Sequence, residues 1–134
     1  MLSFILLCCC LPICIASLQH ITIIGQTICS RTIISNISID LWEADSFDPD
    51  DFLNATFSNQ NGYFQLYGEE SELGNIEPYL RILHNCVDGR VNEMCSVRDL
   101  YTIPPKYIGR IYDMGIVNLG IARQQHFEIC SYML

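Results

Sequence analysis

Alternating apolar and polar residues are the dominant pattern along this chain. From residue 37 to 41, every odd position is an isoleucine or a leucine, and the even positions are polar. A period of two is typical of a strand with one buried face. The same kind of pattern predicts strands over residues 21–29, 37–44, 53–58, 63–68, 79–86, 96–103 and 111–119. Seven short strands separated by turn signals predict an all-β sandwich.

One hairpin can be assigned from its turn. Asn61-Gly62 is a strong turn signal because both residues tolerate a positive φ. The strands over 53–58 and 63–68 are therefore expected to form a hairpin. The polar segment 69–75 (EESELGN) is predicted to be one helical turn or a loop.

The N-terminal segment indicates export. Residues 2–15 are almost wholly apolar, but they are too few to cross a bilayer, which takes about 20 residues. They fit the hydrophobic region of a signal peptide, with cleavage expected after Ala16 or Ser17. We therefore predict a signal peptide over 1–17, one secreted β-sandwich domain over 18–134, and no membrane span in the mature chain. An uncleaved anchor is the alternative.

Removal of that segment leaves four cysteines of the original 8: Cys29, Cys86, Cys95 and Cys130. An even number in a short secreted chain indicates two disulfides, with three connectivities to choose from. Cys86 and Cys95 are close enough in sequence to close a local loop, which would leave Cys29 paired with Cys130. Closing that long loop would stabilise the fold by about 4 to 5 kcal/mol on the chain-entropy treatment.

Two further features fit secretion. Asn36-Ile37-Ser38 and Asn54-Ala55-Thr56 are N-glycosylation sequons, and both asparagines fall on the polar side of a predicted strand. The chain has 7 basic and 15 acidic residues, for a net charge of −8. That balance argues against nucleic acid and against a polybasic grip on anionic lipid.

The acidic stretch 43–52 is a candidate cation site. Asp45, Asp48, Asp50 and Asp51 crowd around one proline. An EF-hand loop that began at Asp48 would need an oxygen ligand at its fifth position, where Phe52 stands. A solvated loop between strands is the main interpretation, and weak Ca²⁺ binding is the alternative. Catalysis is disfavoured because no apolar surroundings isolate one acid from the others.

A zinc site is a second metal candidate. His84, Cys86, Cys95 and His126 form a mixed histidine and cysteine set. An oxidising compartment favours disulfides over thiolate ligands, so no metal site and no cofactor is predicted. His84 shares strand parity with apolar residues and is expected to be half-buried, with a hydrogen bond to the backbone.

An immunoglobulin domain is suggested by one set of residues. Cys29, Trp42 and Cys86 follow the cysteine–tryptophan–cysteine order of that fold. Trp42, however, lies on the polar parity of its strand, and His84 stands two residues before Cys86, where a tyrosine corner needs tyrosine. We therefore expect a different sandwich.

A larger set of residues, in order and spacing, resembles the transthyretin-like proteins of nematodes over about residues 21–130. The set comprises Gly25, Cys29, Asp45, 48–51, 62–66, Gly68, 77–80, 84–86, Cys95, 103–104, 107–108, 112–115, 118–119 and Cys130. One departure is the segment 30–35 (SRTIIS), where family members usually carry a Gly/Pro-containing loop with basic residues.

The resemblance implies a transthyretin/prealbumin-like Greek-key β-sandwich of seven or eight strands with two disulfides. It implies a secreted, non-enzymatic protein that binds an extracellular or cell-surface partner as an adaptor. A carrier of a small apolar ligand in an oligomer channel is the alternative. A protease inhibitor and an enzyme similar to hydroxyisourate hydrolase are disfavoured. Such hydrolases end in a Tyr-Arg-Gly-Ser tail, which this chain lacks. Trp42 and Tyr132 are candidate contact residues.

Overall fold

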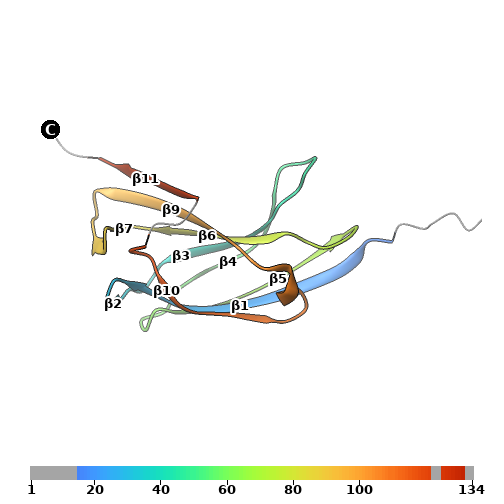
Figure 1. The fold of residues 1–134 in the computed structure, drawn as a ribbon, viewed down its shortest axis with the longest axis horizontal. Coiled ribbons are helices and arrows are strands. Elements are labelled where there is room, and N and C mark those ends of the chain that lie inside the picture. The colour runs from blue at the N-terminus through green and yellow to red at the C-terminus, as the bar shows by residue number, and fades with distance from the viewer. Residues whose placement is uncertain (1–14, 122–124, 132–134) are drawn as a thin grey trace, which may run out of the picture.

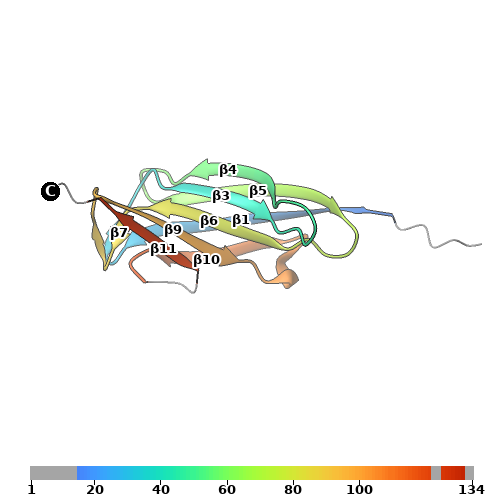
Figure 2. The same ribbon diagram turned by 90° about the horizontal axis from the view of Figure 1, so that it is seen from above.

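The computed structural model describes residues 15–121 and 125–131. Two β-sheets pack face to face, as Figure 1 and the rotated view in Figure 2 show. The predicted all-β sandwich is therefore confirmed, and the seven predicted strands all form. In the described part of the chain, no helix is long and apolar enough to cross a membrane.

The first sheet is built around β1, its longest strand. β1 pairs in parallel with β10 on one side and antiparallel with β5 and β2 on the other. The pairing with β5 runs from Ser17 opposite Glu72 to Gln26 opposite Tyr63. The strands are β1 (Ser17–Cys29), β2 (Thr32–Ile33), β5 (Tyr63–Glu72) and β10 (Ile111–Asn118).

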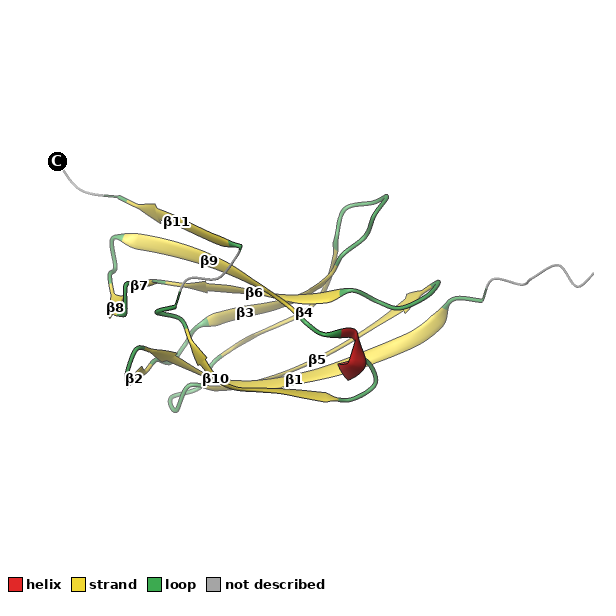
Figure 3. Ribbon diagram, viewed as in Figure 1, coloured by secondary structure: helices red, strands yellow, loops and turns green. Residues whose placement is uncertain are grey.

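The second sheet is antiparallel throughout, in the order β11-β9-β6-β3-β4. Its strands are β3 (Ser38–Glu43), β4 (Asp51–Phe57), β6 (Pro78–His84), β9 (Cys95–Thr102) and β11 (His126–Cys130). A small ribbon of β7 (Cys86–Val87) and β8 (Arg90–Val91) follows β6. The 3-10 turn η1 (Pro105–Tyr107) follows β9 on the way to β10, and it is the helical element drawn in Figure 3.

The core lies between the sheets and is formed by alternate residues of the strands. Ile39 and Leu41 of β3 have no exposed surface, as the period of two predicts. The alternation is weaker in β4, which is an edge strand: Leu53 packs against the core, but Phe57 is 61% exposed. The aliphatic residues with no exposed surface are Ile21, Ile23, Ile39, Leu41, Ile76, Leu80, Ile82 and Val97.

The predicted turn at Asn61-Gly62 forms, but the predicted hairpin between β4 and β5 is wrong. β4 pairs with β3 in the second sheet and β5 pairs with β1 in the first, so the chain crosses from one layer to the other at this turn. Gly62 has a φ of +77°, and a Cβ there would lie 2.6 Å from the carbonyl oxygen of Thr27. Asn59 Oδ1 accepts hydrogen bonds from the backbone N–H groups of Asn61 and Tyr63, at 3.0 and 2.9 Å. Only glycine fits this turn, because it needs both the positive φ and the close backbone approach.

Two segments differ from the sequence prediction. Glu69–Glu72 extends β5, so this part of 69–75 is strand; its pairing with β1 continues as far as Ser17. Strand β11 was not predicted, and it adds an edge to the second sheet beside β9. In both cases pairing with a neighbouring strand determines the conformation, while the local pattern is only weakly strand-like.

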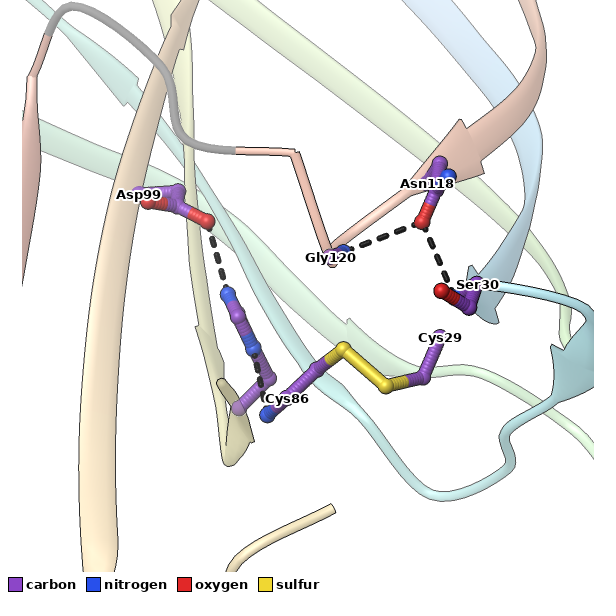
Figure 4. The surroundings of a disulfide bond; sticks show 7 residues. Cys29, Ser30, Cys86, Asp99, Asn118 and Gly120 are labelled. Carbon is purple, nitrogen blue, oxygen red and sulfur yellow. Dashed lines mark hydrogen bonds and ion pairs between the residues drawn. A yellow bond between two sulfur atoms is a disulfide. The ribbon is translucent and has the colours of Figure 1, made fainter. Parts of the chain in front are cut away.

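The predicted disulfide pairing is wrong. The bonds join Cys29 to Cys86 and Cys95 to Cys130. Cys29 ends β1 in the first sheet and Cys86 begins β7 just after β6, so this bond joins the two layers (Figure 4). Cys95 and Cys130 are direct partners in the β9–β11 pairing. Closeness in sequence misled the prediction, because Cys86 and Cys95 face different partners across space.

Candidate functional site

The outer face of the first sheet carries three aligned rows of side chains. Ile21 and Ile23 of β1 point into the core, so their neighbours Thr22, Ile24 and Gln26 point outward. The strand register places a residue of β5 and one of β10 beside each of these. From one end to the other, the rows are Tyr67–Thr22–Ile111, Gln65–Ile24–Asp113 and Tyr63–Gln26–Ile116.

A groove of about 540 Å³ crosses this face, and apolar side chains of Ile24, Tyr63 and Ile116 line it. The β1–β10 register shifts between Ile24 and Gln26, and the bulge places Gly115 in the groove wall. Gly115 has a φ of +63°, and a Cβ there would meet no atom within 4 Å. The hollow therefore exists because a bulge and a glycine leave the space unfilled.

Trp42, a predicted contact residue, is packed on the outer face of the second sheet. Its ring meets Phe52 edge-on at 5.4 Å between centroids, and the Arg81 guanidinium lies 4.9 Å above it. Arg81 is fixed in turn by Asp40, at 2.6 Å between Nη2 and Oδ2. Trp42 is thus only partly exposed. Tyr132, the other predicted contact residue, lies outside the described residues.

The acidic loop is organised by its own aspartates. Asp50 Oδ1 accepts the backbone N–H of Asp45, and Asp50 Oδ2 accepts the Tyr79 hydroxyl at 2.6 Å. The Tyr79 hydrogen bond lowers the pKa of Asp50. Asp45 Oδ1 accepts the N–H of Phe47 at 3.0 Å. Asp45, Asp48 and Asp50 join no carboxylate cluster in the described part of the chain, whereas Asp51 does.

That cluster centres on Glu43, the first residue of the acidic stretch 43–52. Glu43 is 2% exposed. Its Oε1 accepts the Glu77 N–H at 3.3 Å, and its Oε2 has no hydrogen-bond partner. One carboxylate oxygen from each of Glu43, Asp51 and Glu72 lies within 4.8 Å of the others. Burial, reinforced by the charges of Glu72, Glu70 and Asp51, raises the pKa of Glu43 to about 7.

This buried acid gives a testable pH dependence. Between pH 4.5, its ordinary pKa, and about 7, the folded chain holds a proton on Glu43 that the unfolded chain releases. The free energy of unfolding should therefore fall by up to about 3 kcal/mol as pH rises across this range. In EDTA, the free energy of unfolding of the Glu43→Gln variant should change less with pH than that of wild type, and at pH 8 the variant should be the more stable of the two. Urea unfolding at a series of pH values measures this free energy.

Glu93→Gln is the matched control, because Glu93 is exposed before β9 and should leave the pH profile as in wild type. A wild-type profile that is flat between pH 5 and 8, or one that Glu43→Gln leaves unchanged, would contradict the raised pKa of Glu43.

The second buried polar group is a histidine–aspartate–histidine set around Asp99 of β9, which has no exposed surface. His84 Nδ1 accepts the Cys86 N–H at 3.0 Å, so its Nε2 carries the hydrogen and donates to Asp99 at 2.7 Å. His126 Nδ1 lies 2.5 Å from the other carboxylate oxygen of Asp99. The set links β6, β9 and β11. The expected backbone bond of His84 is confirmed, although the residue is fully rather than half buried.

Charge in this set follows from its contacts. Burial alone would raise the pKa of Asp99, but hydrogen bonds from His84 and His126 outweigh it and lower that pKa. Burial likewise opposes the charged form of His126, but its bonds to Asp99 and Glu128 raise the pKa of this histidine. The side chain of His84 is 0% exposed, so solutes cannot reach it. The arrangement is a structural brace.

The four residues considered as zinc ligands have other partners in the structure: the histidines bond to Asp99, and the cysteines form disulfides. Cys86 and Cys95 are each bonded to another sulfur, so neither offers a thiolate to a metal. His84 and His126 both bond to Asp99. The mixed cysteine and histidine set considered from the sequence is therefore not assembled.

Both sequon asparagines are exposed. Asn36 has a φ of +59° in the turn before β3. Asn54 lies on the edge strand β4, and its Nδ2 donates to the Tyr67 carbonyl at 2.7 Å. Their exposure is compatible with glycosylation, which stays a prediction.

These features define a two-layer, disulfide-stabilised β-sandwich with a groove on one outer face. A model of the transthyretin-like family matches residues 24–104. Transthyretin-like protein 16 of Caenorhabditis elegans is 37% identical over 127 residues, covering 95% of each chain. Transthyretin-like protein 46 of the same organism is 32% identical over 108 residues, covering 75% of this chain and 60% of its own. The chain belongs to the transthyretin-like family, as the sequence resemblance predicted.

Among solved structures, a 9R-lipoxygenase from Cyanothece aligns over 77% of this chain and 16% of its own length, with 22% identity and a TM-score of 0.46. A similarity this low carries no argument about function.

Proposed function

We propose that the chain is a secreted, non-enzymatic binding protein that acts as an extracellular or cell-surface adaptor. Its contact surface is the outer face of the β5–β1–β10 sheet. The observation that carries this proposal is the groove on that face, bordered by exposed apolar side chains. The partner is an extracellular or cell-surface protein, and the role requires no cofactor.

The chemistry of this face suits recognition of another protein. Tyr63, Tyr67, Ile111 and Ile116 are 56, 46, 62 and 66% exposed. Contiguous exposed apolar surface often marks an interaction site, and tyrosines are enriched where proteins meet. The register places each of these side chains in one of the three rows. They therefore lie on one face of the sheet, in its two end rows, with Ile24 in the row between them.

The framework supports a site of action outside the cell. Four cysteines form two disulfides, which persist mainly in oxidising compartments. The predicted signal peptide over residues 1–17 would deliver the chain to such a compartment; most of that segment lies outside the described residues.

A non-enzymatic role fits the placement of the histidines. His84 is enclosed, and His126 is bonded to Asp99 and Glu128. His20 is separate from both and stacks with Tyr67 at 6.0 Å on the outer face of the first sheet. This differs from a hydroxyisourate hydrolase, whose histidines and arginines would meet substrate together.

A matched pair of variants tests the contact surface. Fluorescently labelled, glycosylated protein is applied to nematode cells, and saturable binding is measured. Ile116→Lys places a charge in the groove and should weaken binding at least tenfold, the effect of about 1.4 kcal/mol. Val91→Lys is the control: this residue is also an exposed aliphatic, at 52%, but it lies in β8. Equal binding by the two variants would contradict the proposal, as would the absence of saturable binding by wild type.

The groove also supports a second candidate function, carriage of a small apolar molecule. Its volume of about 540 Å³ lies in the range of small-molecule pockets, about 300 to 1,000 Å³. It is open on one face, so a transthyretin-style channel would need a second copy to close it. Light scattering separates the two functions: the adaptor predicts a stable monomer, and the channel carrier predicts an oligomer.

A further inference from the structure

The described residues contain one carboxylate cluster that neither the fold nor the proposed function explains. Glu43 ends β3, Asp51 begins β4, and Glu72 ends β5. Glu43 and Asp51 are direct partners in the β3–β4 pairing. We propose that these three carboxylates form a calcium site that joins the two sheets.

The spacing of the oxygens suits one bound ion. Calcium lies about 2.3 to 2.6 Å from its oxygen ligands, so two ligands of one ion are at most about 5 Å apart. One oxygen from each of Glu43, Asp51 and Glu72 meets this limit, because all lie within 4.8 Å of one another. The three side chains come from three different strands. Their convergence is thus a property of the tertiary fold.

The unpartnered oxygen of Glu43 is independent evidence for a ligand. Oε2 has no hydrogen-bond partner, in a residue that is only 2% exposed. Buried carboxylate oxygens are normally hydrogen-bonded, paired with a cation or bound to a metal. A cation held between Glu43, Asp51 and Glu72 would give this oxygen a partner.

The charge of the cluster is otherwise uncompensated. In the part of the chain that the structure describes, no ion pair joins a lysine, arginine or histidine to any of the three acids. Glu70 lies close enough to add to the repulsion on Glu43. A divalent cation removes this repulsion, whereas a monovalent ion would leave more of it.

The surroundings favour calcium among divalent cations. All three ligands are carboxylates, which hard cations prefer over the nitrogen and sulfur that zinc and copper take. A hollow of about 330 Å³ opens beside Glu43 and Glu72, with Asp45 and Asn75 in its lining. It leaves room for water and additional oxygen ligands. Calcium accepts six to eight oxygens in flexible geometry, whereas Magnesium demands a near-ideal octahedron.

The calcium site would add a second link between the two sheets. The Cys29–Cys86 bond joins the sheets where β1 ends, while Glu72 pairs with Ser17 at the start of β1. Figures 1 and 2 show these as opposite ends of the molecule, with β7 at one end and the loops after β3 and β5 at the other. A calcium ion on β3, β4 and β5 would hold the end that has no disulfide.

Thermal unfolding of the mature, disulfide-bonded chain tests this inference. The melting temperature is measured in EDTA and then in CaCl₂, MgCl₂ or NaCl of matched ionic strength. At a calcium concentration ten times the dissociation constant, we expect a rise of about 5 °C. Glu43→Gln and Asp51→Asn should abolish the rise. Asp48→Asn should keep it, because Asp48 lies in the neighbouring loop outside the cluster.

Terbium luminescence provides a second readout that does not depend on stability. Trp42, the one tryptophan of the chain, directly precedes Glu43 and can sensitise a lanthanide bound there. Wild type should show sensitised emission that CaCl₂ displaces, and Asp51→Asn should not. Ile116→Lys should keep the calcium response, so failure of the groove proposal and failure of this one are distinguishable.

Three results would overturn the calcium site. The first is no rise in the melting temperature of wild type as CaCl₂ is raised in tenfold steps to about 10 mM, which is ten times the weakest dissociation constant expected of extracellular sites, about 1 mM. The second is an equal rise in matched MgCl₂ or NaCl, which would indicate general charge screening. The third is an Asp51→Asn response equal to that of wild type.

Discussion

Asp99→Ala should destabilise the fold by about 3 to 5 kcal/mol, the effect expected when one partner of a buried charged set is removed. Asp99 has no exposed surface and receives hydrogen bonds from both His84 and His126. Alanine would leave both imidazoles without their acceptor and would open a cavity. Because His126 lies on β11, we also expect this edge strand to separate from β9 before the rest of the sandwich unfolds. Urea unfolding followed by Trp42 fluorescence measures the loss.

The loss should depend on pH in a defined direction. The lowered pKa of Asp99 means that its contribution is present above 3.8, its ordinary value, and is lost as pH falls through the folded value. The raised pKa of His126 means that its contribution is fully present below 6.5 and is lost as pH rises through the folded value. The effect of Asp99→Ala should therefore be greatest between about pH 4 and 6.5.

Asp48→Ala is the control for this experiment, because Asp48 lies exposed in the loop after β3 and should cost less than about 0.5 kcal/mol. Asp99→Asn adds a variant of the same shape with no charge, which should lie between alanine and wild type. An Asp99→Ala effect below about 1 kcal/mol would show that the histidines do not depend on this carboxylate.

Removal of the Cys29–Cys86 disulfide should have the second large effect. Its cysteines are 57 residues apart in sequence, and the chain-entropy treatment gives about 4 kcal/mol for a loop of this length. Both are also buried, at 3 and 1% exposed, so Cys29→Ala with Cys86→Ala loses packing between the sheets as well. We expect the melting temperature to fall by about 15 °C or more.

The Cys95–Cys130 bond provides the comparison. It spans 35 residues and joins neighbouring strands of one sheet at its edge. Cys95→Ala with Cys130→Ala should therefore lower the melting temperature less, and limited proteolysis should cleave first near β11. An equal or larger loss of stability from this second pair would contradict the view that the first bond holds the two layers together.

The central strands could be predicted because each has one buried face. Residues 37–44 and 79–86 sit between neighbours on both sides, so their alternation directly reflects the sandwich. Strand β11 could not be predicted in the same way. It is an edge strand whose partner is β9, far away in sequence, and its phenylalanine and isoleucine are about half exposed. Its position is determined by Cys130 and His126 rather than by a hydrophobic face.

The disulfide pairing shows where distance in sequence misleads. Cys86 and Cys95 are separated by the β7–β8 ribbon and never meet. The order Cys29, Trp42, Cys86 was set aside with the immunoglobulin fold, yet its outer two residues do form the inter-sheet bond. That order was a usable signal, because a cysteine at the end of each of two facing strands can join two layers without implying one particular family.

Strand parity could have revealed both buried acids. Glu43 shares the parity of Ile39 and Leu41, and Asp99 shares that of Val97 and Tyr101, so each stands where an apolar residue is expected. The groove had no such signal. It depends on a bulge between β1 and β10 and on the positive φ of Gly115, and neither is visible before the register of the two strands is known.

The central claim is that the chain is exported and then held together by one disulfide between the sheets and one at the edge. Mass spectrometry of the protein recovered from the medium of expressing cells tests it directly, with peptides mapped without reduction. We predict an N-terminus at Ser17 or Leu18, links from Cys29 to Cys86 and from Cys95 to Cys130, and no free thiol. An intact N-terminus on protein retained in the cells, or a folded protein with free cysteines, would contradict the account.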